Sequence, residues 1–62
     1  MYKYQLWAWT YIKGGERKEW HRSIYRKNKL TEKQKESLSG KFADKLAWEH
    51  NCNIWLYGCN EI

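Results

Sequence analysis

The chain has 62 residues, a formal net charge of +5 and an aromatic content of 18%, with 5 Trp and 5 Tyr. A chain this short builds one small hydrophobic core, worth roughly 3–5 kcal/mol, and has little scaffold left to enclose a catalytic cleft. Length and composition therefore exclude a multidomain architecture and predict one non-enzymatic domain over residues 1–62 that binds a partner on its surface.

The positive charge is concentrated in the first half of the chain. Residues 1–29 carry eight Lys and Arg against Glu16 and Glu19, a balance of +6, whereas residues 30–50 carry four charges of each sign. Charge gathered in one part of a small domain indicates an anionic surface on the partner.

The first predicted element is a strand over residues 2–13, which is rich in strand formers and has no turn residue before Gly14. Alternate side chains of a strand point to opposite faces of the sheet. The smaller set suits close packing beneath a helix and comprises Leu6, Ala8 and Thr10. The bulkier set, which we expect on the opposite face, comprises Trp7, Trp9 and Tyr11.

The two glycines at 14–15 predict a tight hairpin turn, because glycine accepts the positive φ angles of such turns. A second strand follows over residues 17–27. Two registers are open: a two-residue loop pairs Trp9 with Trp20, whereas a three-residue loop pairs Trp9 with His21. The choice decides which basic side chains share a face with the aromatic residues, since a one-residue slip exchanges the faces of a strand.

A helix is predicted over residues 31–50. Its start fits a capping box, in which the side chains of Thr31 and Gln34 each bond the other residue's backbone N–H. One apolar stripe at helical spacing marks the positions expected to be most buried, which are Leu38, Phe42 and Leu46. Trp48 lies off this stripe and either covers the sheet edge or contacts a partner.

A short third strand is predicted over residues 53–57, with Ile54 and Leu56 toward the helix and Trp55 and Tyr57 on the other face. The first strand is the longest and least charged, so we place it at the centre of the sheet. The expected fold is a small α+β domain of β-β-α-β order, in which a three-stranded antiparallel sheet of strand order 2-1-3 carries one helix on one face.

The two cysteines, Cys52 and Cys59, are predicted to be free thiols. In a strand they would lie roughly 23 Å apart, whereas a disulfide tolerates a Cα separation of at most about 7 Å. With His50 they lack the short paired spacings of zinc sites, so we expect no metal and no cofactor. Free thiols, no apolar run long enough to cross a membrane and no export signal predict a cytoplasmic protein.

No motif for catalysis is present, such as a glycine-rich phosphate loop or a nucleophile elbow, so no catalytic residue is predicted. The residues expected to bind a partner combine aromatic and basic side chains: Trp7, Trp9, Tyr11, Lys13, Lys18, Trp20, Arg22, Arg26, Trp55 and Tyr57. Trp, Tyr and Arg are the residue types that dominate protein interfaces.

Two classes of partner fit these residues. The first is a protein: small basic chains of this kind resemble phage or mobile-element products that inhibit or modulate a host protein such as a nuclease or polymerase. The second is single-stranded nucleic acid, whose bases stack on exposed rings while basic residues attend the phosphates. A homodimer through the same face of the sheet is a third possibility.

Overall fold

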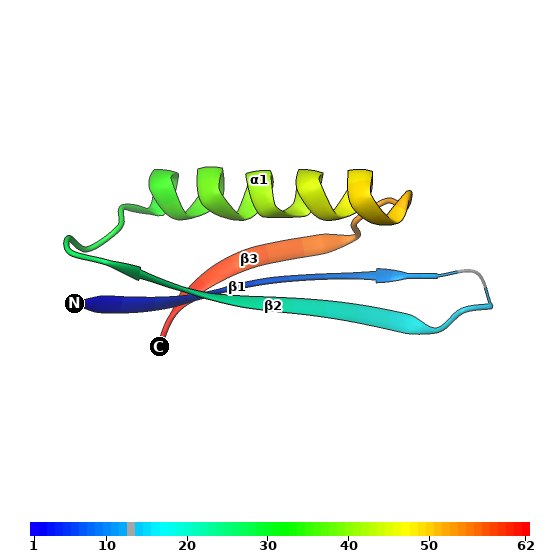
Figure 1. Ribbon diagram of the computed structural model, residues 1–62, viewed down its shortest axis with the longest axis horizontal. Coiled ribbons are helices and arrows are strands. Elements are labelled where there is room, and N and C mark those ends of the chain that lie inside the picture. Colours follow the sequence, from blue (N-terminus) through cyan, green and yellow to red (C-terminus); the bar gives the residue numbers. More distant parts are fainter. Residues whose placement is uncertain (13) are drawn as a thin grey trace.

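The computed structural model describes residues 1–12 and 14–62. Its elements, in chain order, are β1 (Tyr2–Tyr11), β2 (Arg17–Arg26), α1 (Glu32–His50) and β3 (Leu56–Glu61). The strands form one antiparallel sheet of order β2-β1-β3, and α1 runs along one face of it (Figure 1). The predicted α+β class, element order and strand order are confirmed.

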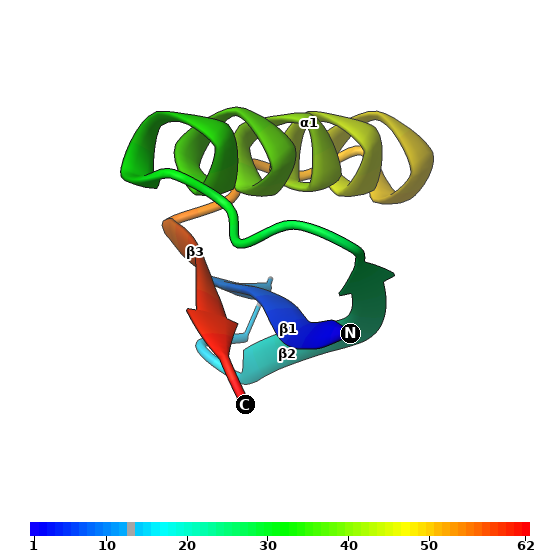
Figure 2. The ribbon, with the colours of Figure 1, turned by 90° about the vertical axis from the view of Figure 1, so that its left-hand side faces the viewer.

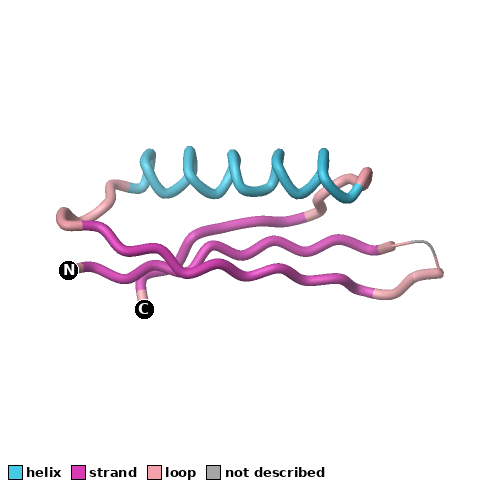
Figure 3. Tube along the Cα trace, in the orientation of Figure 1, coloured by secondary structure: helices cyan, strands magenta, loops and turns pink. Residues whose placement is uncertain are grey.

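The molecule is elongated, with extents of 41 × 17 × 17 Å. The hairpin of β1 and β2 projects past the end of α1, as the tube in Figure 3 shows. Because β3 is shorter than its neighbours, only two strands continue toward the hairpin tip. Seen from the end of the molecule, β2 and β3 flank β1 beneath the helix (Figure 2).

The hairpin adopts neither predicted register. Trp7 pairs with His21 and Trp9 with Glu19, so each residue of β1 meets a partner one or two positions earlier than expected. The ladder continues past β1, where the Ile12 N–H donates to the Glu16 carbonyl at 2.8 Å. Lys13 lies outside the described residues. The strands are slightly shorter than the predicted ranges 2–13 and 17–27.

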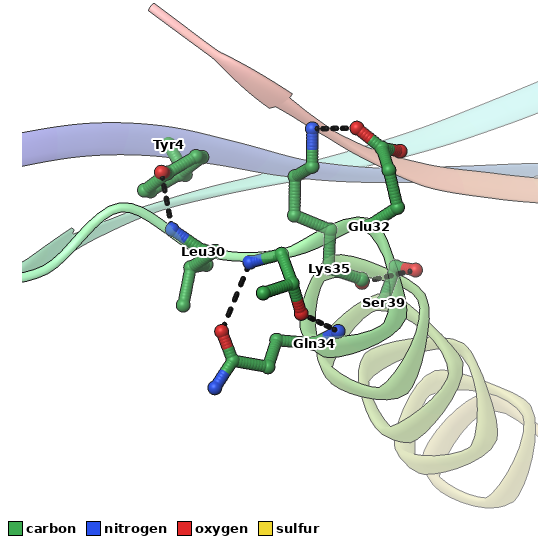
Figure 4. Close-up of polar contacts among 7 residues, drawn as sticks. Tyr4, Leu30, Glu32, Gln34, Lys35 and Ser39 are labelled. Carbon is green, nitrogen blue, oxygen red and sulfur yellow. Dashed lines mark hydrogen bonds and ion pairs between the residues drawn. The ribbon is translucent and has the colours of Figure 1, made fainter.

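The start of α1 is fixed by hydrogen bonds that the sequence predicts. Thr31 is the N-cap: its hydroxyl accepts from the Gln34 N–H at 3.1 Å, and its own N–H donates to the Gln34 side chain at 2.9 Å (Figure 4). The Leu30 N–H donates to the Tyr4 hydroxyl at 2.8 Å and ties the helix entrance to β1. Asn51 ends the helix with a left-handed backbone, φ 50°.

The buried stripe of α1 agrees with the predicted one at Leu46 and differs from it at Leu38 and Phe42. Ser39, Ala43 and Leu46 are buried, whereas Leu38 and Phe42 are only half-buried. Small side chains at the contact let the helix backbone approach the sheet closely, and the Ser39 hydroxyl is satisfied by donating to the Lys35 carbonyl at 2.9 Å. The larger side chains are consequently displaced to the flank of the helix.

The third strand lies later in the chain than the predicted range 53–57, and its faces are reversed. Leu6 pairs with Cys59 and Ala8 with Tyr57, so Tyr57 lies on the helix side. Leu56 pairs with Trp9 on the opposite side and is half exposed, which corrects its expected place beneath the helix. Before β3, the Asn53 carbonyl accepts from the buried Thr10 hydroxyl, which ties this segment to β1 outside the predicted strand.

Candidate binding surface on the open face of the sheet

The face of the sheet away from α1, here called the open face, carries the bulky residues of β1. Trp7, Trp9 and Tyr11 lie on it as predicted, since their neighbours at even positions are buried beneath the helix. Trp7 and Trp9 are half-buried and Tyr11 is 47% exposed. The open face is therefore an aromatic surface with no described element covering it.

Three rings pack together where β3 begins, and we call Trp9, Tyr11 and Trp55 the aromatic cluster. Trp9 and Trp55 are stacked with centroids 6.3 Å apart and an interplanar angle of 17°. Tyr11 meets both indoles edge to face, at 5.4 Å from Trp9 and 5.2 Å from Trp55. The backbone N–H of Trp55 donates to the backbone carbonyl of Trp9 at 3.0 Å, which holds the two residues side by side.

Arg17 completes the cluster from β2. Its guanidinium lies 4.2 Å from the Trp9 ring centroid and bonds the Glu19 carboxylate at 2.8 Å. Because β2 and β3 flank β1, Arg17 reaches the Trp9 indole from β2, and Trp55 reaches it from the segment that leads into β3. Such a guanidinium stacked on an indole and anchored by a carboxylate is held in place before any partner arrives.

Trp7 lies flat on β3. A Cβ built on Gly58 would be 2.5 Å from Cζ2 of the Trp7 ring, so the indole occupies the space that a side chain would need. In the orientation that satisfies both groups of its amide, Asn60 accepts from Trp7 Nε1 at 3.3 Å. A shallow hollow of about 320 Å³ lies beside this ring, next to His21.

Four residues of β2 that were predicted for the open face, three of them basic, lie on the helix side of the sheet instead. The observed register pairs Lys18, Trp20, Arg22 and Arg26 with even positions of β1, which places all four on the helix side of the sheet. Tyr57 is on the helix side as well, beside Gly40. Among the described residues, the open face carries two Lys or Arg side chains, Lys3 and Arg17, and Arg17 pairs with Glu19.

Two further tryptophans have separate surroundings. Trp20 stacks against His50, with ring centroids 4.9 Å apart, and Lys18 lies 6.0 Å from its ring. Trp48 is 87% exposed, so it does not cover the sheet edge, and the alternative expected for it, a partner contact, stays a prediction. It lies outside the aromatic cluster and serves as a reference tryptophan for this surface.

Sequence reasoning missed Arg17 and Leu56. Both expected registers placed Arg17 away from Trp9, and the expected range of the third strand put Leu56 under the helix. A signal was present in Gly58, because a glycine in a short strand can mark the close approach of a large ring. Placing Gly58 beside Trp7 would have put Leu56 beside Trp9.

The cysteines are both free thiols. Burial raises the pKa of Cys59 above its ordinary value, opposed by the nearby charges of Lys35 and Arg26. Across residues 1–12 and 14–62, His, Cys, Asp and Glu side chains form no group of three or more that could hold a metal ion.

Within the part of the chain that the structure describes, no helix combines the length and apolar character needed to cross a membrane. Comparison with known proteins finds no match for this chain. No family model matches the chain, and neither the curated proteins nor the solved structures yield a match.

Proposed function

We propose that this chain is a non-catalytic binding module that holds a partner protein against the open face of its sheet, and thereby inhibits or modulates that partner. The observation that carries the proposal is the aromatic cluster with Arg17 stacked on it. Trp, Tyr and Arg are the side chains that contribute most to protein interfaces, and here they gather at one uncovered place.

The geometry of Trp9 favours a protein over single-stranded nucleic acid. Base stacking needs a free ring face, and the Trp9 indole already stacks with the Arg17 guanidinium and the Trp55 ring. Phosphates also need unpaired cations along the strand path, whereas among the described residues of the open face Arg17 is paired with Glu19 and Lys3 is the one other Lys or Arg. A protein surface requires neither feature.

The cluster is also held in place in advance, which favours tight association. Each ring is fixed by at least two ring or cation contacts, so little side-chain freedom is lost when a partner binds. Trp55 is 64% exposed and presents the largest accessible apolar surface of the cluster. We therefore assign Trp55 the role of the central contact.

The proposal is tested by affinity capture from a lysate of the cells that produce the protein, with and without nuclease treatment. Trp55→Ser removes the central contact, and Trp48→Ser is the matched control, since both tryptophans are well exposed. We expect a discrete protein that survives nuclease treatment, is retained by Trp48→Ser and is lost with Trp55→Ser. Material that disappears on nuclease treatment would support the nucleic-acid function instead.

The third possible occupant of the open face, a second copy of the chain, is tested by analytical ultracentrifugation. We expect a monomer at every concentration for both wild type and Trp55→Ser. A wild-type dimer that Trp55→Ser converts to a monomer would show that the open face is a self-association interface.

A further inference from the structure

A groove opens between β2 and α1 on the helix side of the sheet. The backbone of the helix lies over β1 and β3 and farther from β2, and the resulting groove has a volume of about 280 Å³. Its floor is apolar and consists of Leu6, Ile24, Leu38 and Phe42. Its rim is basic on both sides, with Arg22 and Arg26 from β2 and Lys41 and Lys45 from α1. We call this surface the basic groove.

The charge of the rim is barely neutralised. All four rim residues are exposed, and no acidic residue lines the groove. Among the described residues, the sole rim cation with a carboxylate within 4 Å is Lys45, which lies 3.8 Å from Glu49. The Arg26 guanidinium donates to the Tyr25 carbonyl at 2.8 Å, which leaves its charge unpaired. The rim therefore presents positive charge on both sides of an apolar floor.

We propose that the basic groove binds an acidic, amphipathic peptide segment of a partner protein. One or two apolar side chains of the segment occupy the floor, and flanking Asp or Glu residues reach the cations on either rim. The groove lies at the lower end of the roughly 300–1,000 Å³ typical of small-molecule sites, a size that accommodates one or two apolar side chains. The positive charge of the rim favours acidic side chains in the occupant, and the apolar floor favours apolar side chains in the same occupant.

The floor distinguishes this occupant from nucleic acid. Sugars and base edges placed on Leu6, Ile24 and Leu38 would lose water without gaining hydrogen-bond partners, which is costly. Phe42 is the one ring lining the groove, so successive bases would find no series of stacking platforms. Apolar peptide side chains meet no such penalty.

This site is independent of the proposed function. The basic groove and the aromatic cluster lie on opposite sides of the sheet and share no residue. Substitutions on the groove rim should leave binding at the open face unchanged, so failure of one proposal is distinguishable from failure of the other.

The experiment measures fluorescence anisotropy of a labelled synthetic peptide that carries Leu and Phe at helical spacing with Glu and Asp on the flanks. The test variant is Arg22→Gln/Lys41→Gln, and the control is Lys29→Gln/Lys33→Gln, which removes two exposed cations outside the groove. We expect about a tenfold weaker affinity for the test variant and less than about a twofold change for the control. Thermal melts confirm that both variants remain folded.

Two altered peptides, measured against the wild-type protein, test separately the contribution of the acidic side chains and that of the apolar side chains. Replacing every Glu and Asp with Gln, or every Leu and Phe with Ala, should each reduce affinity at least about tenfold. Equal loss in the test and control variants would overturn the proposal, since it would indicate attraction to the net charge alone. Absence of peptide binding, or tighter rim-dependent binding of oligothymidylate or phosphatidylserine vesicles, would overturn it as well.

Discussion

The indole of Trp7 lies directly on the backbone of Gly58, in the volume where any other residue would carry its Cβ atom. This contact joins the central strand to β3 on the open face, and it accounts for the glycine in the middle of a six-residue strand. A large ring that covers a strand glycine compensates for the side chain that the glycine lacks. The contact sets the position of Trp7 and supports the neighbouring aromatic cluster.

Gly58→Ala should destabilise the protein. The new methyl group would overlap the Trp7 ring, so the indole must move, and overpacking of this kind costs about 1–3 kcal/mol. We expect the midpoint of thermal unfolding, followed by circular dichroism, to fall by roughly 4–8 °C per kcal/mol. An unchanged midpoint would show that Trp7 does not rest on β3.

Gly40→Ala should have the opposite effect. A Cβ at Gly40 would lie 3.8 Å from the Tyr57 hydroxyl, which is ordinary contact, and alanine is favoured over glycine within a helix. The free energy of unfolding should rise by about 0.5–1 kcal/mol. Urea titration measures this change, and a decrease would mean that Tyr57 packs more tightly on α1 than the structure indicates.

Leu46→Ala should cost more stability than Leu38→Ala. Leu46 is 7% exposed at the contact between helix and sheet, whereas Leu38 is half-buried in the basic groove. Truncating a buried leucine costs about 2–5 kcal/mol, which approaches the whole stability of a domain this small. Urea titration of the two variants provides the comparison. Greater loss from Leu38→Ala would show that Leu38, and not Leu46, lies at the centre of the core.

The Cys59 thiol should make the fold less stable at alkaline pH. Burial disfavours the thiolate and raises the pKa of Cys59 in the folded state, so the unfolded chain releases the proton first. Between the two pKa values the folded state holds more protons, and the free energy of unfolding therefore falls as pH rises past the ordinary pKa of a thiol.

Because tyrosines and lysines also titrate in this range, the effect is measured as the difference between wild type and Cys59→Ala. That difference should begin to decrease near the ordinary pKa of a thiol and level off above the raised pKa of Cys59 in the folded protein. A flat difference would show that Cys59 titrates alike in the folded and unfolded chains. Iodoacetamide should also modify Cys59 more slowly in the folded protein than in urea.

The features predicted correctly from the sequence depend on local physics. The capping box of Thr31 and Gln34 involves residues three apart, and the alternation along β1 follows from strand geometry alone. The strand order followed from the length and low charge of β1. Each of these inferences needs no knowledge of what lies across the sheet.

The features that could not be predicted depend on contacts between distant parts of the chain. The hairpin register decides whether Arg17 or Arg22 shares a face with Trp9, and the Gly-Gly turn is compatible with several registers. The buried stripe of α1 is centred on small residues such as Ser39, because close approach to the sheet outweighs side-chain hydrophobicity there. The reversed face of Tyr57 follows from Trp7 lying over Gly58.

The central claim, that the open face binds a protein, is tested most directly by photo-crosslinking in the cells that produce the chain. Benzoylphenylalanine replaces Trp55 in one protein and Trp48 in another, and the products are separated and identified by mass spectrometry. We predict that the probe at position 55 crosslinks to a discrete partner protein and that the probe at position 48 does not. Equal crosslinking at the two positions, or crosslinks from position 55 to nucleic acid alone, would contradict the account.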